Sequence, residues 1–222
     1  MDESHRKSAE RVRSEIERGL RPPSFRDALM AVPAAERDAW VDRVLGLGEL
    51  PSDGRDLPSG CVPYLPCSVD ALLRTVDHAP VRASDVFVDV GSGVGRAAAL
   101  VHLLTGAPAV GLEIQRDLVV AARELAARLV LSRVSFVEGD ALVLAERLGL
   151  GSVFFLYCPF GGERVTKLLS ALEPIARTKA ITICCIDLPL PPCSWLVLEP
   201  SVGPDLAIHR STLHLSDRGL PA

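Results

Sequence analysis

Short apolar runs separated by helix-like segments repeat through most of the chain. The clearest unit is VFVDVGSGVGRAAALVHLLTG, residues 86–106. Its first five residues are mostly apolar and β-branched, which predicts a strand buried on both faces. Three glycines follow, and residues 96–104 have the apolar density of a packed helix that ends at Gly106, a residue able to adopt positive φ. The pattern therefore predicts a strand, a glycine turn and a helix.

The alternation continues to residue 213 and predicts an α/β fold. We expect a Rossmann-like, seven-stranded, mostly parallel sheet with helices on both faces. The other six strands are expected at residues 109–113, 134–138, 152–158, 179–187, 195–200 and 206–213. Helices are expected at residues 116–131 and 163–172, with a short one ending near Gly149. The proline-rich segment LPLPPCS forms a crossover loop, and the last two strands close the sheet as an antiparallel pair.

The first 60 residues have a different pattern, in which arginine alternates with acidic residues. Helical stretches are expected around residues 8–20 and 35–47, separated by the sequence RPPS, with a turn-rich connector at residues 48–60. The chain therefore divides into a helical N-terminal extension, residues 1–60, and a main domain, residues 61–222. We expect the extension to act as a lid over the acceptor site and to exclude water.

Composition narrows the possible functions. The 222 residues are 48% hydrophobic and 23% charged, and the net charge of −4 argues against a nucleic-acid-coating surface. The apolar runs are shorter than the roughly 20 residues of a membrane span, and the charged N-terminus does not have the pattern of a secretory signal. The six cysteines lack metal-ligand spacing, so we expect no metal, reduced thiols and a cytoplasmic protein. These features leave the oligomeric state open.

Acidic residues at three strand ends indicate the cofactor. The turn reads G-S-G-V-G-R, which differs from the G-x-G-x-x-G spacing of dinucleotide sites. Asp89 precedes the turn, where a carboxylate would repel a pyrophosphate and attract an amino group. Glu113 can accept hydrogen bonds from ribose hydroxyls, and Asp140 can accept one from an adenine amine. An amine, a ribose and an adenine in this order describe S-adenosylmethionine.

Three motifs together resemble those of the class I, seven-strand S-adenosylmethionine-dependent methyltransferases. They are DVGSGVGR, GLEIQ and VEGDAL, and the resemblance covers residues 64–213. It implies that the glycine turn surrounds the methionine end of the cofactor, that the second strand end binds the ribose and that the third faces the adenine. The implied cofactor-binding residues are Tyr64, Pro66, Asp89, Gly91, Ser92, Gly93, Gly95, Glu113, Ile114, Asp140, Ala141 and Tyr157.

Two further segments are similar to those of seven-strand protein-lysine methyltransferases. PYLPCSVDALLRTV is similar to the Pro-Tyr-x-Pro segment of the mitochondrial group, and FFLYCPFGGERV resembles the fourth-strand tip of that group and of the telomeric-silencing histone methyltransferases. The resemblance implies that Cys158, Pro159 and Phe160 bind the substrate. Related amine-directed enzymes often have Asn or Asp at the position of Cys158, so a protein lysine and a small natural product both stay open as acceptors.

Two other functions are compatible with the same motifs. An aminopropyltransferase would favour several acidic residues around a polyamine groove, and the tip YCPF has none. A catalytically silent cofactor-binding module would keep the same carboxylates. No catalytic residue and no general base can be assigned from the sequence, which is compatible with methyl transfer because a sulfonium is already a strong methyl donor and alignment supplies much of the acceleration.

Overall fold

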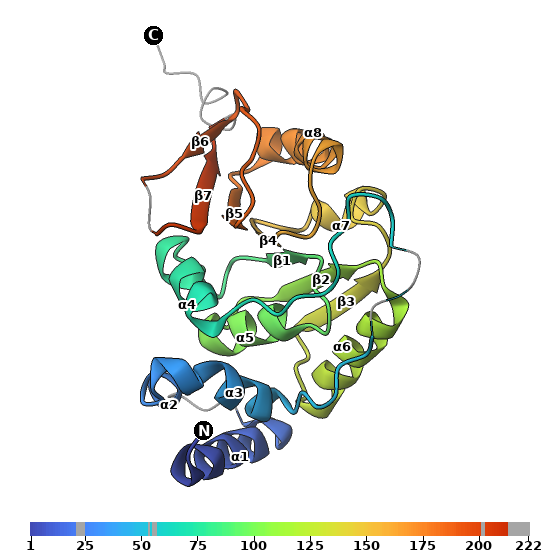
Figure 1. Ribbon diagram of the computed structural model, residues 1–222. Coiled ribbons are helices and arrows are strands. Elements are labelled where there is room, and N and C mark those ends of the chain that lie inside the picture. Colours follow the sequence, from blue (N-terminus) through green and yellow to red (C-terminus); the bar gives the residue numbers. More distant parts are fainter. Residues whose placement is uncertain (21–24, 53, 55–56, 201–202, 213–222) are drawn as a thin grey trace.

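A computed structural model describes residues 1–20, 25–52, 54, 57–200 and 203–212 (Figure 1). The RPPS segment, part of the connector and the last ten residues of the expected main domain lie outside these ranges. The described strands form one seven-stranded sheet in the order β3-β2-β1-β4-β5-β7-β6. Their bounds are β1 Phe87–Val90, β2 Ala109–Glu113, β3 Val134–Glu138, β4 Val153–Tyr157, β5 Thr182–Ile186, β6 Leu196–Leu198 and β7 Leu206–Ser211.

The pairing of the strands confirms the expected architecture. Strands β1 to β5 are parallel to one another, whereas β7 runs antiparallel to both β5 and β6. Helices α4 (Val69–His78), α5 (Arg96–Thr105) and α6 (Arg116–Arg128) cover one face of the sheet. Helices α7 (Ala145–Leu148) and α8 (Glu163–Thr178) cover the other face (Figure 1). The sheet is thus a Rossmann-like layer between two helical layers.

Burial of both faces explains why the strands are almost continuously apolar. Along β4, Phe155 joins the core under α4, α5 and α6, whereas Phe154 and Leu156 join the core under α7 and α8. The same alternation places Phe87 of β1 against Phe155, with ring centroids 5.7 Å apart. Each side of the strand therefore meets an apolar layer, as in parallel sheets covered on both faces.

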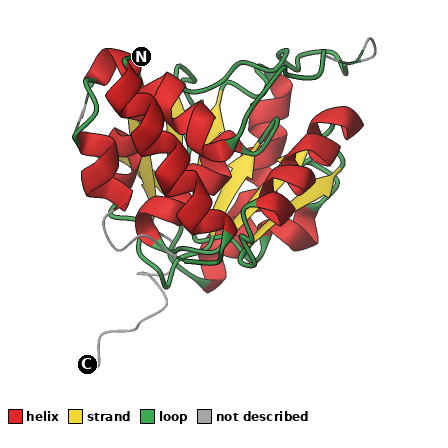
Figure 2. Ribbon diagram, turned by 90° about the horizontal axis from the view of Figure 1, so that it is seen from below, coloured by secondary structure: helices red, strands yellow, loops and turns green. Residues whose placement is uncertain are grey.

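The N-terminal extension forms a third helical layer outside α5 (Figures 1 and 2). It consists of α1 (Glu3–Glu17), α2 (Phe25–Met30) and α3 (Ala34–Leu45). Helix α1 begins five residues earlier than expected because the Asp2 side chain accepts a hydrogen bond from the amide of His5 and caps it. The sequence pattern missed α2 and α4. Trp40 of α3 is fully buried and packs against Phe25 of α2, and both helices contact α5 of the main domain.

Arg96, the first residue of α5, joins the extension to the glycine turn. Its guanidinium is buried, and it donates from Nε to Asp42 at 2.6 Å and from Nη2 to Asp38 at 2.8 Å. A third bond runs from Nη1 to the carbonyl of Cys67, before α4. One side chain thus connects α3, the segment that precedes α4 and the start of α5.

Candidate active site

A cleft of about 880 Å³, including its open mouth, lies at the carboxyl ends of the parallel strands. Its walls are Gly91 after β1, the end of β2, the turn after β3, the tip of β4 and Asp187 after β5. Ligands of open α/β sheets bind at this edge, at the point where the strand order reverses. Here the order reverses between β1 and β4, so the cleft occupies the position expected for a nucleotide-like ligand.

Glu113 holds the glycine turn in place. Its Oε2 accepts a hydrogen bond from the amide of Gly93 and its Oε1 one from the amide of Gln115, both at 2.8 Å. The turn needs this support because Gly91, Gly93 and Gly95 all have positive φ, which costs side-chain-bearing residues free energy. Each carboxylate oxygen can accept a second hydrogen bond. Glu113 can therefore order the turn and still bind a pair of hydroxyl groups in the cleft.

Asp89 is buried beneath this turn and carries an unsatisfied oxygen. Its side chain is 3% exposed, the amide of Ala98 hydrogen-bonds it, and Oδ2 has no partner within the described ranges. Burial, together with the charge of Glu113, raises the pKa of Asp89 to about 7. A buried carboxylate with a free oxygen suits a cationic ligand group, which would supply the missing partner. The Oγ of Ser92 is also buried, with no partner in the described part of the chain.

Asp140 faces the cleft from the turn after β3. Its Oδ1 accepts hydrogen bonds from Nη2 of Arg164 at 2.7 Å and from the amide of Leu142 at 3.0 Å. Both bonds use one oxygen, so Oδ2 is available to a donor such as an amino group. Arg164 also lies over the ring of Phe160, with its Cζ 5.2 Å from the centroid, and this links α8 to the tip of β4.

The roof of the cleft is formed by the connector, which in the structure continues past its expected end at residue 60 to residue 65, and not by the N-terminal helices. Residues 57 and 61–65 line the cavity. The connector is attached to the tip of β4 through a bridge between Cys61 and Phe160, and the amide of Val62 donates to the carbonyl of Pro159 at 3.2 Å. Helix α3 packs on α4 and α5, α2 packs on α5 and α1 packs on α3, and these three helices contribute no residue to the cavity lining. The expectation that the N-terminal helices border the acceptor pocket is therefore wrong for this cavity, and a lid role for the connector stays a prediction.

Most of the residues expected at the site line this cavity. They are Tyr64, Gly91, Glu113, Ile114, Asp140, Ala141, Tyr157, Cys158, Pro159 and Phe160. Five others have different surroundings. Asp89 and Ser92 lie beneath the turn, the ring of Tyr64 covers Gly93, and a side chain at Gly95 would meet the ring of Phe136 rather than the cavity. Pro66 is exposed and does not line the cavity.

Three polar residues of the cavity were missed by the sequence analysis. Asp187 directly follows β5, so its strand-end position could have identified it. Gln115 comes two residues after Glu113, and its Oε1 accepts a hydrogen bond from the amide of Gly54 in the connector at 2.7 Å. Arg164 gives no such signal because it comes from α8 and reaches the cleft only through the packing of that helix.

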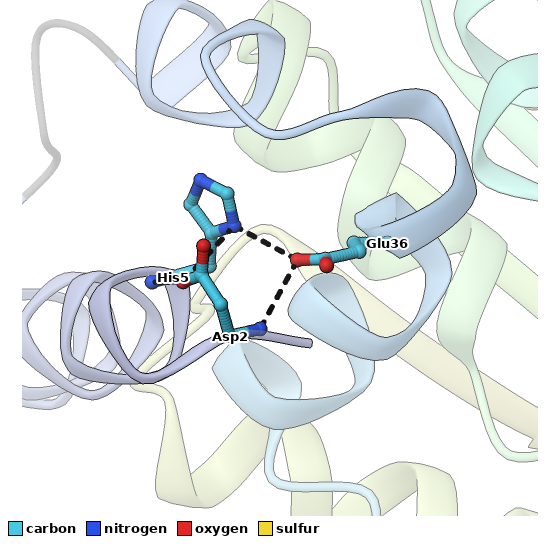
Figure 3. A group of neighbouring side chains, drawn as sticks. All are labelled: Asp2, His5 and Glu36. Atoms are coloured by element: carbon cyan, nitrogen blue, oxygen red, sulfur yellow. Dashed lines mark hydrogen bonds and ion pairs between the residues drawn. The ribbon is translucent and has the colours of Figure 1, made fainter.

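Away from the cleft, one group of side chains has the composition of a metal site. Asp2, His5 and Glu36 each place a ligand atom within 4.8 Å of the others (Figure 3). Nδ1 of His5 is 2.8 Å from Oε2 of Glu36, and Oδ1 of Asp2 caps α1. The group thus joins α1 to α3 through its own hydrogen bonds.

None of the helices in the described ranges combines the length and apolarity that crossing a membrane requires.

Comparison with known proteins identifies the fold. No protein-family model and none of the curated proteins matches the sequence. The structure is similar to that of an RNA methyltransferase from Salinibacter ruber in complex with S-adenosyl-L-homocysteine, with a TM-score of 0.51 and 25% identity over 71% of this chain and 97% of the other. The fold is therefore the α/β Rossmann-like fold of the methyltransferases.

Two more distant structures share this fold. The protein yhhF from Escherichia coli, described as a methyltransferase, has a TM-score of 0.54 and 17% identity over 68% of this chain and 90% of its own. The protein MtNAS, solved with MTA and tNA, has a TM-score of 0.53 and 13% identity over 92% of this chain and 70% of its own. The high coverage of this chain by MtNAS shows that its similarity extends beyond the main domain.

Proposed function

We propose that this protein is an S-adenosylmethionine-dependent methyltransferase that methylates an amine. The observation that carries the proposal is the arrangement of three carboxylates: Glu113 at the end of β2 and Asp140 after β3 line one cleft, and Asp89 is buried at the end of β1, next to the glycine turn. The Salinibacter ruber protein, which has the same fold, was solved with S-adenosyl-L-homocysteine. That compound is the demethylated product of the cofactor proposed for this chain.

Each carboxylate has a distinct role in cofactor binding. Asp89 has a free, buried oxygen for the amino group, Glu113 has acceptor capacity for the ribose hydroxyls, and Oδ2 of Asp140 can accept from the adenine amine. When bound, the cofactor supplies a sulfonium methyl group that a nucleophile can displace. The chain contributes alignment and exclusion of water, because the connector roofs the cleft and the tip of β4 borders the glycine turn.

The charge of the cleft favours a cationic or neutral acceptor over an anionic one. Its charged side chains are three carboxylates and one guanidinium, and Arg164, the guanidinium, is paired with Asp140. A polyanion such as RNA would meet repulsion here. The resemblance to protein-lysine methyltransferases supports a protein lysine amine as the acceptor. A small amine of similar chemistry is the alternative.

Calorimetry with S-adenosyl-L-homocysteine tests cofactor binding. We expect wild-type protein to bind it and not NADH, and Glu113→Gln to weaken binding by about 1–3 kcal/mol because the ribose loses a charged acceptor. Glu138→Gln is the matched control, since Glu138 pairs with Glu113 in the β2–β3 register but is exposed. Binding of NADH but not of S-adenosyl-L-homocysteine would contradict the proposal. Equal affinities of wild type and Glu113→Gln for S-adenosyl-L-homocysteine would also contradict it.

The acceptor class is tested separately. Host lysate is incubated with the protein and methyl-labelled cofactor and is then separated into protein, RNA and small-molecule fractions. We expect label in the protein fraction, recovered as methyl-lysine after hydrolysis. Label found only in RNA would contradict an amine acceptor, and label found only among small molecules would contradict the protein lysine.

A further inference from the structure

Asp187 and Cys158 occupy equivalent positions at the ends of two neighbouring strands. Strands β4 and β5 are parallel, and their last residues, Tyr157 and Ile186, lie opposite each other. Cys158 and Asp187 directly follow these residues and therefore lie at the same edge of the sheet. Both residues have positive φ, 43° at Cys158 and 50° at Asp187, which is uncommon for residues with side chains. This backbone conformation ends both strands at the cleft.

Hydrogen bonds fix the backbone of Asp187 in this position. The thiol of Cys158 donates to the carbonyl of Asp187 at 2.9 Å and to that of Ile186 at 3.2 Å. The amide of Asp187 donates to the carbonyl of Asp205 at 2.9 Å. The carboxylate of Asp205 itself is neutralised by Arg74, with two bonds of 2.6 Å. The backbone of Asp187 is therefore held by Cys158 and by Asp205, and the carboxylate of Asp205 is already paired with Arg74.

The carboxylate of Asp187 is the acidic group of the cleft that has no assigned partner. Glu113 accepts from two amides, and Asp140 is bonded to Arg164. Within the described ranges, the side chain of Asp187 makes neither a hydrogen bond nor an ion pair. The hydrogen bond from Cys158 to the carbonyl of Asp187 places this residue beside the tip of β4, where burial and, after it, the negative charge of Asp187 raise the pKa of the Cys158 thiol.

The order of the strands places Asp187 on the acceptor side. The proposed cofactor residues belong to β1, β2 and β3, whereas β4 and β5 lie on the other side of β1. Neighbouring strands are about 4.8 Å apart, so the end of β5 is roughly 10 Å from the end of β1. The tip of β4 fills this interval and touches the turn, since a Cβ at Gly91 would be 2.7 Å from Cβ of Pro159. A group held at Asp187 therefore lies just beyond the methionine end of the cofactor site.

We propose that Asp187 is a specificity residue that recognises the methyl acceptor, and that its carboxylate selects a cationic amine such as a lysine side chain. The assignment rests on the proposed function of the same cleft. Asp187 holds the charged amine at the β4–β5 edge and disfavours phosphate-bearing acceptors by repulsion. The amine loses a proton to water before transfer, because only the neutral nitrogen has the lone pair that forms the new bond to the methyl carbon as the carbon–sulfur bond breaks. Asp187 also explains how a site with Cys158 at the tip of β4 can bind an amine, because the recognising carboxylate comes from the next strand.

The test uses full-length protein saturated with S-adenosyl-L-homocysteine. Binding of Nα-acetyl-lysine-N-methylamide is followed by NMR titration and compared with Nα-acetyl-norleucine-N-methylamide, which lacks the charged amine. We expect Asp187→Asn to weaken binding of the lysine probe about fivefold, near the upper end for a solvent-accessible charge pair, and to leave the norleucine probe unchanged. Asp27→Asn, an exposed acid on α2, is the control and should bind both probes like wild type.

The affinity for S-adenosyl-L-homocysteine separates the two proposals. Asp187→Asn should bind this compound as tightly as wild type does, because Asp187 lies outside the cofactor half of the cleft. If both proteins bind it and the lysine probe does not distinguish them, the assignment of Asp187 is wrong while the cofactor site stands. If wild type fails to bind it, the proposed function is overturned together with the assignment.

Discussion

The ring of Tyr64 lies where a side chain at position 93 would be. A Cβ built on Gly93 would be 2.0 Å from Cε2 and 2.1 Å from Cδ2 of Tyr64, far inside contact distance. Tyr64 comes from the connector that roofs the cleft, and Gly93 is the middle glycine of the turn after β1. This contact lets the connector close on the turn, and it depends on the absence of a side chain at Gly93.

Substitution of Gly93 should reveal this contact. Gly93→Ala combines a positive φ, which costs about 1–2 kcal/mol, with a collision that displaces the Tyr64 ring. We expect a lower Tm and, by the proposed function, weaker binding of S-adenosyl-L-homocysteine. Adding Tyr64→Ala should recover part of the lost stability, as a double-mutant cycle would measure. Gly161→Ala, where the side chain meets open space, is the control, and an equal loss there would contradict the prediction.

Ionisation of Asp89 should lower the free energy of unfolding as pH rises. Its pKa is about 7 in the folded protein and near 3.8 when exposed, so the folded state binds more protons between these values. The stability that Asp89 contributes is therefore complete below about pH 4 and is lost as pH rises through 7. Asp89→Asn stays uncharged, so its Tm relative to wild type should be higher at pH 8 than at pH 4. Thermal melts across this range test the sign, and a constant difference would contradict it.

Arg96 should be much more important for stability than an exposed arginine. Its guanidinium is 5% exposed and joins Asp38, Asp42 and the carbonyl of Cys67. Arg96→Met should lower the free energy of unfolding by about 3 kcal/mol, as breaking a buried ion pair does. The comparison is Arg26→Met, since Arg26 forms an exposed pair with Asp77 and should lose at most about 1 kcal/mol. Urea unfolding measures both, and similar losses would contradict a special role for Arg96.

The group Asp2, His5 and Glu36 should act as a helix junction and not as a metal site. The hydrogen bond from His5 lowers the pKa of Glu36, so its carboxylate is already stabilised by a neighbour. Treatment with EDTA should leave the Tm unchanged. A fall in Tm that one divalent ion restores, and that His5→Ala abolishes, would show that these residues bind a metal.

The motifs and the alternating pattern correctly predict the sheet and the position of its glycine turn. Residues 86–106 are a single local unit, whose apolar run, glycines and helix are contiguous. The sites at Glu113 and Asp140 could be recognised because Glu113 is the last residue of its strand and Asp140 comes two residues after the end of the next one. In a parallel sheet, the carboxyl ends of neighbouring strands meet at one edge, so sequence order alone brings these residues together.

The sequence alone therefore determined the class of fold and predicted the residues that we propose to bind the cofactor, because each unit of strand, turn and helix consists of residues close together in the chain. Tertiary structure decided the roof and the acceptor half. The placement of Tyr64 on Gly93, the pairing of Arg164 with Asp140 and the support of Asp187 by Cys158 join segments more than 20 residues apart. The N-terminal helices were expected over the opening because they were the largest element outside the core. Their apolar faces instead bury Trp40 and Phe25 against the body, and burial of apolar surface decides where a helix packs.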